Sequence, residues 1–403
     1  AASQLMAIIK PFAALRPRPE LAAQVCELPY DVLSSEEARQ LAADNPLSFL
    51  HVSKPEIDLP PDTNPYAPEV YAKGRENLRR LLADGVLRQD AEPCFHLYRQ
   101  VMGAHSQTGL VAVASCEEYL AGVIKKHELT RQDKEDDRIR HVDQVNAQTG
   151  PVFISYRTRP GLNEIVAKIT AGRPEYEFTA EDGVVHTAWV VADQARMDAI
   201  RSEFDQVDAL YIADGHHRAA AGATIARKRR KPSQAQESDG VLAVFFPHDQ
   251  LKVMDYNRAV KDLRGLSAEQ FLEKISSSFI VTKGFAAKSP QRLHDFGMYL
   301  GGAWYCLTIK EGAYDAKDPV ASLDAAILQD HLLAPVLGIA DPRTDDRIKF
   351  IGGIRGMAEL EKLVDQDGFA VAFSLHPTTM EQIMNVADAG AIMPPKSTWF
   401  EPK

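Results

Sequence analysis

The sequence predicts a mixed α/β protein with two lobes. Strand-like and helix-like patterns alternate along the chain without internal repeats. The chain has 403 residues, and a single hydrophobic core rarely grows beyond about 250–300 residues. The basic, polar stretch 228–239 is typical of an exposed loop between lobes. We therefore expect an N-terminal lobe over residues 1–235 and a closely packed α+β lobe over residues 236–403.

The individual elements follow from hydrophobic periodicity and from start and stop signals. Ser34 or Ser35, followed by Glu37 and Arg39, marks a capped helix start. Gly85 ends a long amphipathic helix, and the polar segment 103–108 separates two strands as a hairpin turn. We expect helices at 34–43, 71–84, 195–204, 216–230, 323–337 and 355–364, and strands at 95–99, 109–116, 119–124, 184–192, 209–213, 240–247 and 301–309.

The composition is that of an ordinary soluble globular protein, with 45% hydrophobic and 25% charged residues. The net charge of −10 argues against binding of nucleic acid along the whole chain, which requires a basic surface. The basic run 227–231 falls at a predicted helix C-terminus, where cations are favoured in any case. We expect no nucleic-acid partner.

The four cysteines are scattered, without a C-x-x-C pair, and no secretory hydrophobic segment is evident near the N-terminus. These features indicate a reducing, cytoplasmic setting. No apolar run approaches the roughly 20 residues that span a bilayer. We expect no membrane partner, and the oligomeric state stays open.

The most informative segment is a strand, a tight turn and a helix around Asp214-Gly215-His216-His217-Arg218. Asp214 is placed to cap the helix, and Gly215 permits the turn. The first backbone N–H groups of a helix are unpaired and its dipole end is positive, so His216, His217 and Arg218 would add donors where an anion already binds well. The segment predicts a phosphate or carboxylate site.

A second group of ionisable residues follows the strand-like segment 119–124. Lys125, Lys126, His127 and Glu128 lie where α/β proteins collect catalytic groups, at the end of a strand. Glu128 has the chemistry of a general base. The charged stretch 131–140 that comes next is equally typical of a solvated helix.

Several familiar signatures are absent from the sequence. It contains no P-loop, no G-x-G-x-x-G fingerprint, no H-E-x-x-H motif, no Cys/His cluster with zinc spacing and no G-x-S-x-G elbow. The segment 390–397 has P-loop spacing, but Pro395 replaces the second glycine and removes a backbone donor. A structural metal and a serine hydrolase are therefore not expected.

Motifs spread over nearly the whole chain form a recognisable set: Lys10-Pro11-Phe12, Leu15-Arg16-Pro17, Pro29-Tyr30-Asp31-Val32, Asn45-Pro46, Phe49-Leu50-His51-Val52, Tyr98-Arg99-Gln100, Lys125-Lys126-His127-Glu128, the turn 214–218 and the tail 393–403. Together they resemble the domain-of-unknown-function family 1015 of bacteria and archaea. The turn also resembles the phosphate-binding element of the ParB and sulfiredoxin superfamily, whose relatives include nucleotide-using kinases that phosphorylate free L-serine. By analogy, this resemblance implies serine biosynthesis.

The resemblance implies a kinase that transfers a phosphoryl group from ATP or ADP, with Mg²⁺, to the hydroxyl of L-serine or a similar metabolite. Phosphoryl transfer needs positioning and charge neutralisation more than covalent chemistry. In this hypothesis the turn from Gly215 to Arg218 binds nucleotide phosphates, with Arg218 as a bidentate clamp. Lys125 or Lys126 neutralises the transferring group, and Glu128 accepts the hydroxyl proton.

Three further assignments complete this hypothesis. Asp214 or Glu135 would hold the Mg²⁺ that accompanies the nucleotide, and Asp214 is the second candidate for the base. Lys396 would reach the phosphate site from the second lobe, because the prolines and aromatics around it can fix it in space. The alternative for this tail is that it only packs a lobe shut.

Two other functions use the same residues. A non-catalytic regulator that binds a nucleotide or phosphometabolite needs the turn but not Glu128. A histidine phosphatase would use His216 or His217 as its nucleophile. The substrate identity stays open at this point.

Overall fold

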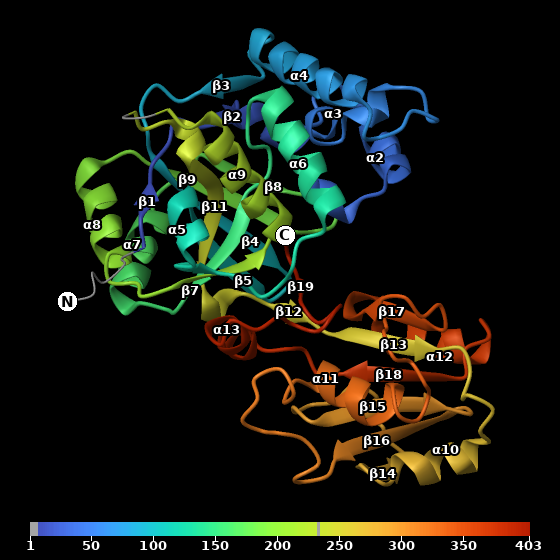
Figure 1. The fold of residues 1–403 in the computed structure, drawn as a ribbon. Helices are drawn as coiled ribbons and strands as arrows, with labels where there is room; N and C mark the ends of the chain where they lie inside the picture. Colours follow the sequence, from blue (N-terminus) through green and yellow to red (C-terminus); the bar gives the residue numbers. More distant parts are fainter. Residues whose placement is uncertain (1–6, 232–233) are drawn as a thin grey trace. The chain divides into compact units, whose positions relative to one another are not determined.

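The computed structural model describes residues 7–231 and 234–403. The chain forms two compact units, the first reaching to Leu251 and including Pro402–Lys403, the second spanning Lys252–Glu401. The expected boundary at 235/236 falls inside the first unit, because strand β11 (Gly240–Pro247) pairs with β5 (His105–Ser115) and β7 (Val152–Tyr156) of the first sheet. The predicted mixed α/β class is confirmed (Figure 1).

A mixed sheet of nine strands, counted over the described residues, organises the first unit. Among the described strands of this sheet, only the pairs β6/β10 and β7/β11 are parallel. In spatial order the strands are β6 (Ile124–Lys125), β10 (Leu210–Asp214), β7, β11, β5, β4 (Phe95–Met102), β9 (Val185–Val191) and β8 (Tyr176–Thr179), with β1 (Ile9–Lys10) against β5. A separate ladder joins β2 (Leu15–Pro17) to β3 (Leu87–Gln89).

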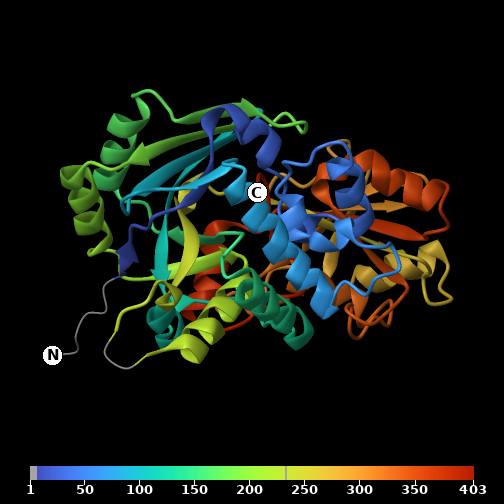
Figure 2. The same ribbon diagram turned by 90° about the horizontal axis from the view of Figure 1, so that it is seen from above.

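In the first unit α5, α7 and α9 contact this sheet, whereas α4 packs on α6, which lies between α4 and α9 (Figures 1 and 2). Helix α9 packs closely on the sheet because a Cβ at Gly222 would lie only 2.6 Å from Val241 of β11. The helices are α1 (Ala22–Val25), α2 (Ser35–Ala42), α3 (Leu50–Ser53), α4 (Pro68–Ala83), α5 (Cys116–Ala121), α6 (Gln132–Val145), α7 (Pro160–Thr170), α8 (Gln194–Phe204) and α9 (His216–Arg229).

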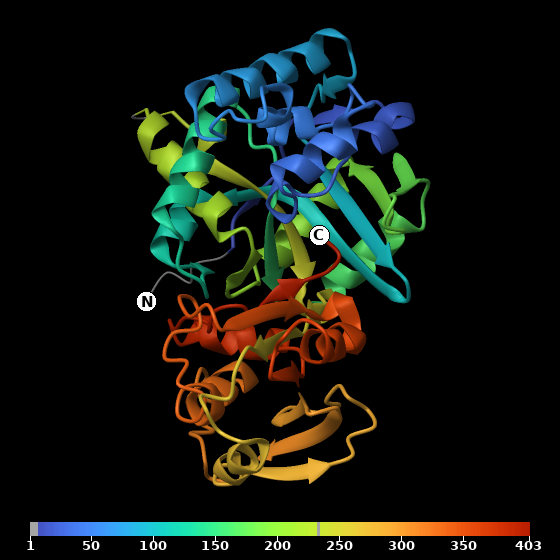
Figure 3. The same ribbon diagram turned by 90° about the vertical axis from the view of Figure 1, so that its right-hand side faces the viewer.

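The second unit is built on an antiparallel sheet, seen in yellow to red in Figure 3. Its core includes Phe271, Phe296 and Phe373. The sheet order is β14 (Phe279–Lys283), β16 (Ala303–Ile309), β15 (Asp295–Leu300), β18 (Val371–Leu375), β13 (Tyr256–Val260) and β17 (Ile348–Gly352), with α10 (Ala268–Ile275), α11 (Asp324–Leu328), α12 (Gly356–Asp365), α13 (Met380–Asp388) and the pair β12 (Val253–Met254)/β19 (Trp399–Phe400).

Most local predictions are confirmed. Ser34 and Glu37 form a complete capping box on α2, and β4 and β5 form the expected hairpin. The strand prediction at 119–124 is wrong, because the Ser115 hydroxyl caps a short helix, α5, which ends at the left-handed Gly122 before β6 begins. The predicted helix 323–337 is interrupted, since α11 continues as a π-helical segment over Gln329–Leu333.

The segment 228–239 does not join the two units. Helix α9 continues to Arg229, and β11, which follows the segment, belongs to the first unit. Lys228 and Arg229 pair with Asp143 of α6, at 2.5 and 2.9 Å, so these cations stabilise helix packing. In the part of the chain that the structure describes, no helix is long and apolar enough to cross a membrane.

Candidate functional site

The predicted anion site is centred on the start of α9. Gly215 joins β10 to α9 with φ = 93°, in the left-handed region that favours glycine. Gly215 is the N-cap, and no side chain caps the helix, so the expected capping role of Asp214 is wrong. Asp214 instead ends β10 and binds two cations.

The backbone donors at this helix start are available. Over residues 7–231 and 234–403, no acceptor meets the N–H groups of His216, His217 or Arg218, whereas the N–H of Ala219 closes the first helical bond to Gly215, at 2.9 Å. Unpaired N–H groups and the positive end of the helix dipole favour an anion at this position.

Asp214 forms the centre of a charged cluster. Its carboxylate accepts from the Arg218 guanidinium at 2.9 Å and from the Lys403 ammonium at 3.4 Å. Burial would raise the pKa of Asp214, but the charges of Lys403 and Arg218 outweigh it and lower the pKa. Asp31 lies 3.8 Å from the same guanidinium. The cluster therefore holds two cations beside the free N–H groups.

Arg218 is fixed in this cluster by the backbone around it. Its side chain donates to the Pro151 carbonyl and lies against Gly215, where a Cβ would be 3.0 Å from Nε. Nε is buried and has no hydrogen-bond partner among the described residues. A small cavity of about 20 Å³ adjoins the guanidinium, lined also by Tyr30 and Thr149.

His216 and Glu128 come together from different elements. His216 is only 3% exposed, and its Nδ1 lies 3.8 Å from Oε2 of Glu128, which is 52% exposed. The backbone N–H of His127 donates to Nε2 of His216 at 3.4 Å, which assigns the ring proton to Nδ1, facing the carboxylate. The two predicted motifs thus form one site.

The site histidines are neutral near pH 7. Burial, with the nearby His127 and His217, lowers the pKa of His216 well below its usual range. Burial lowers the pKa of His127 to about 4, although the Asp214 carboxylate opposes this shift. Burial also lowers the pKa of His217, whose Nε2 accepts from the backbone N–H of Arg131 at 3.1 Å. Positive charge therefore comes from Arg218, from lysines and from the helix start.

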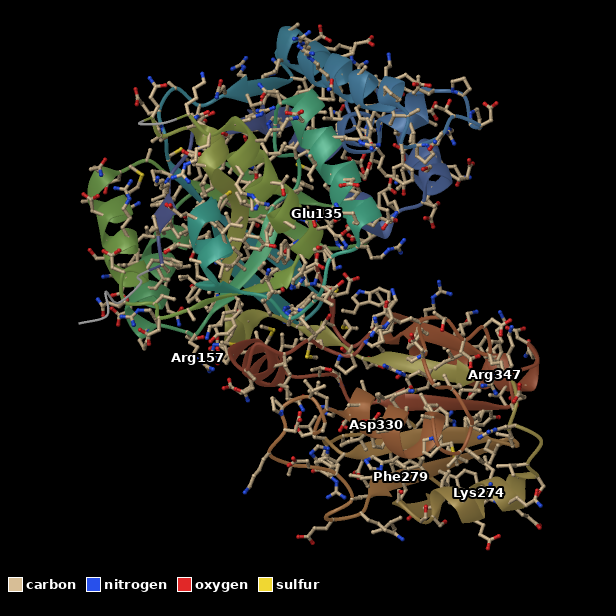
Figure 4. All side chains as sticks on the ribbon, in the orientation of Figure 1. Glu135, Arg157, Lys274, Phe279, Asp330 and Arg347 are labelled. Atoms are coloured by element: carbon tan, nitrogen blue, oxygen red, sulfur yellow. The ribbon has the colours of Figure 1, made fainter. Side chains whose placement is uncertain are left out.

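The remaining predicted residues have other partners. Lys125 and Lys126 lie over the rings of Tyr211 and Tyr119, at 5.6 and 5.0 Å. Glu135, on α6 (Figure 4), accepts from the Thr130 hydroxyl at 2.9 Å.

Lys396 belongs to the second unit, where its ammonium lies 5.8 Å from the centre of the Tyr256 ring. The residue-level reasoning missed Asp31, Pro151 and Lys403, although Asp31 and Lys403 lie within the quoted motifs.

Two groups among the described residues bring three possible metal ligands within 4.8 Å of one another. One is His127, Glu128 and His216, and the other is Asp90, Cys94 and His96. Asp214 and Glu135, which we expected to hold Mg²⁺, are in neither group.

Comparisons with known proteins agree with the family resemblance. The family model described as "Protein of unknown function (DUF1015)" matches residues 9–326. No curated protein matches the chain.

Several solved structures are similar over 72% of this chain, including these three. A conserved hypothetical protein from Pyrococcus furiosus is 14% identical, with 90% of its chain covered and a TM-score of 0.33. A free serine kinase in complex with AMP is 14% identical, with 86% covered and a TM-score of 0.35. SbnI with a C-terminal truncation, from Staphylococcus aureus, is 10% identical, with 82% covered and a TM-score of 0.36.

Proposed function

The chain belongs to the family described as protein of unknown function DUF1015, and we propose that it is a nucleotide-dependent phosphotransferase acting on the hydroxyl group of a small metabolite. The observation that carries this proposal is the start of α9, where free backbone N–H groups and the cations Arg218 and Lys403 lie around one turn. A nucleotide phosphate is the anion that such a turn suits best.

The phosphate cradle combines neutral and charged donors. The N–H groups of His216, His217 and Arg218 point along the helix axis toward its N-terminal end. The two terminal nitrogens of Arg218 bind Asp214 and Pro151, and its Nε is buried against Gly215, so a bound phosphate would meet the guanidinium at the nitrogen that faces Asp214. Asp214 therefore restrains Arg218 and Lys403 in the absence of phosphate, and a bound phosphate would share both cations with it.

Mg²⁺ would enter with the nucleotide as part of the substrate. Asp214 could coordinate Mg²⁺ only after it loses its contact with Arg218 or Lys403, because both of its carboxylate oxygens are paired with these cations. Glu135 is the other proposed ligand, although its carboxylate accepts from Thr130.

We assign the general base to Glu128, whose carboxylate is 52% exposed and lies 3.8 Å from Nδ1 of His216. The acceptor hydroxyl oxygen would attack the terminal phosphorus, the bond from that phosphorus to the bridging oxygen would break, and the hydroxyl proton would pass to the Glu128 carboxylate. His216 is a positioning residue in this step, because its Nδ1–H faces that carboxylate from a buried ring. Lys125 and Lys126 would neutralise the transferring group.

The acceptor that we propose first is free L-serine, with ATP or ADP as donor, because the motif resemblance implies them. A histidine phosphatase is less well supported. The Nε2 atoms of His216 and His217 already accept from backbone N–H groups, and the His216 ring is buried. A nucleophilic histidine needs an accessible nitrogen.

The test is a screen of small hydroxyl compounds, beginning with L-serine, against ATP or ADP with Mg²⁺, in which phosphorylated product is read by mass. Nucleotide binding is measured in parallel by calorimetry. A phosphorylated product supports the proposal. Nucleotide binding without any product indicates the regulator instead, and absence of nucleotide binding overturns both.

A further inference from the structure

A second cluster of reactive side chains lies outside the α9 site, where the chain enters β4. Cys94 and His96 flank Phe95, so strand alternation directs both side chains to one face. Asp90 follows β3 and lies opposite them. Its Oδ2 is 3.5 Å from Nε2 of His96 and 3.6 Å from Sγ of Cys94, and Sγ is 3.9 Å from Nε2.

We propose that Asp90, Cys94 and His96 bind a Zn²⁺ ion. Zinc bonds of about 2.3 Å to sulfur, 2.0–2.1 Å to nitrogen and 2.0–2.2 Å to oxygen, set at tetrahedral angles, put the donor atoms about 3.3–3.6 Å apart. The three observed separations are within about 0.4 Å of these values. The nitrogen-to-oxygen separation is long for a hydrogen bond but close to that of two ligands sharing a metal.

The ligands are held in place before any metal binds. The backbone N–H of Asp90 donates to the Ala14 carbonyl at 2.9 Å, and the N–H of Cys94 donates to the Phe12 carbonyl at 3.1 Å. Arg16 donates from Nε to Oδ1 of Asp90 at 2.7 Å, so Oδ2 is the oxygen turned toward Cys94 and His96. Outer partners of this kind orient ligands in known metal sites.

Protonation and charge fit a divalent cation. A neutral imidazole and a thiolate are the forms in which His96 and Cys94 would coordinate the metal, so metal binding would release the thiol proton. When Cys94 is a thiolate, the positive charges of Zn²⁺ and Arg16 equal the negative charges of Asp90, Cys94 and Glu175. Glu175 belongs to this count because it pairs with Arg16 at 3.1 Å.

The ligand set also selects the ion. Thiolate and imidazole favour Zn²⁺, whereas Mg²⁺ and Ca²⁺ prefer oxygen ligands throughout. Three protein ligands leave a fourth position for water or for another small ligand.

The experiment uses the full chain after removal of metal with a chelator, and Co²⁺ as a spectroscopic probe. We expect one Co²⁺ per chain with a thiolate-to-cobalt charge-transfer band, displaced by Zn²⁺. Calorimetry in buffers of different ionisation enthalpy should report release of about one proton, from the Cys94 thiol. Absence of the band, or of stoichiometric Zn²⁺ binding, overturns the proposal.

Variants identify the ligands. Cys94→Ser should abolish the band and weaken Zn²⁺ binding at least about 100-fold, more than loss of an outer partner. Cys116→Ser, the same change at another buried cysteine of the unit, should leave both unchanged. Asp90→Asn is close in shape and should also weaken Zn²⁺ binding, with the fold checked by circular dichroism. Wild-type affinity in folded Asp90→Asn refutes the site even if Cys94→Ser does not fold.

Discussion

Replacing Gly215 by alanine tests the proposed phosphate cradle through its backbone. An alanine at φ = 93° costs about 1–2 kcal/mol relative to glycine. The new Cβ would also lie 3.0 Å from Nε and 3.1 Å from Cζ of Arg218, so the guanidinium must shift. Because that guanidinium sits between Asp214 and the helix start, the shift should weaken nucleotide binding at least about tenfold, or 1.4 kcal/mol.

Gly122→Ala is the matched control for this substitution. Gly122 lies in the same unit with φ = 78°, and a Cβ there meets no atom within 4 Å. In urea titrations the free energy of unfolding of both variants should be about 1–2 kcal/mol lower than that of the wild type. In calorimetry only Gly215→Ala should bind nucleotide more weakly. Equal nucleotide affinities in the two variants would remove the α9 turn from the proposed site.

Three further predictions address the base, the tail and the pH dependence. Glu128→Gln should keep nucleotide affinity within a few-fold and lower turnover about 10²–10⁴-fold. The control Glu117→Gln, at a carboxylate that is 84% exposed, should leave turnover unchanged. Wild-type turnover in Glu128→Gln would mean that another residue is the base. Lys403→Met should weaken nucleotide binding about tenfold, as measured by calorimetry. Lys396→Met should leave nucleotide binding unchanged, because the Lys396 ammonium lies over the Tyr256 ring. If Lys396→Met instead has the larger effect, the phosphate contact belongs to Lys396. Burial lowers the pKa of His141 from 6.5 to about 4, so between these values the unfolded chain binds more protons than the folded chain, and stability falls as the pH falls. Near pH 4.5 the neutral, buried His141 lowers the free energy of unfolding by about 2.5 kcal/mol. His141→Gln should remove this part of the pH dependence of stability in urea titrations. An unchanged pH dependence would contradict the role given to His141.

Local signals account for what the sequence predicted correctly. The capping box at Ser34, the hairpin at 95–116 and the strand, turn and helix around Gly215 each depend on residues within a few positions of one another. The strand prediction at 119–124 failed for the same reason. Apolar residues there suit a strand, but Ser115 and Gly122 provide both ends of a short helix.

Contacts between distant segments could not be predicted in this way. Lys403 reaches Asp214 across nearly half the chain, and Asp31 and Pro151 approach Arg218 from separate loops. Likewise, Asp90, Cys94 and His96 have no familiar zinc spacing. Their convergence depends on how the segment around Phe12 to Ala14 fixes the backbone before β4.

Burial changes the interpretation of the two histidines at the helix start. From the sequence, the imidazoles of His216 and His217 look like hydrogen-bond donors to an anion at the helix start. In the structure both rings are neutral near pH 7, and each accepts a backbone N–H at Nε2. Since the charge at the site comes from Arg218, Lys403 and the helix dipole, anion binding should not depend on histidine protonation. In the proposed phosphotransferase, His216 would then act through Glu128, which it faces, and the two sequence motifs would contribute to one site.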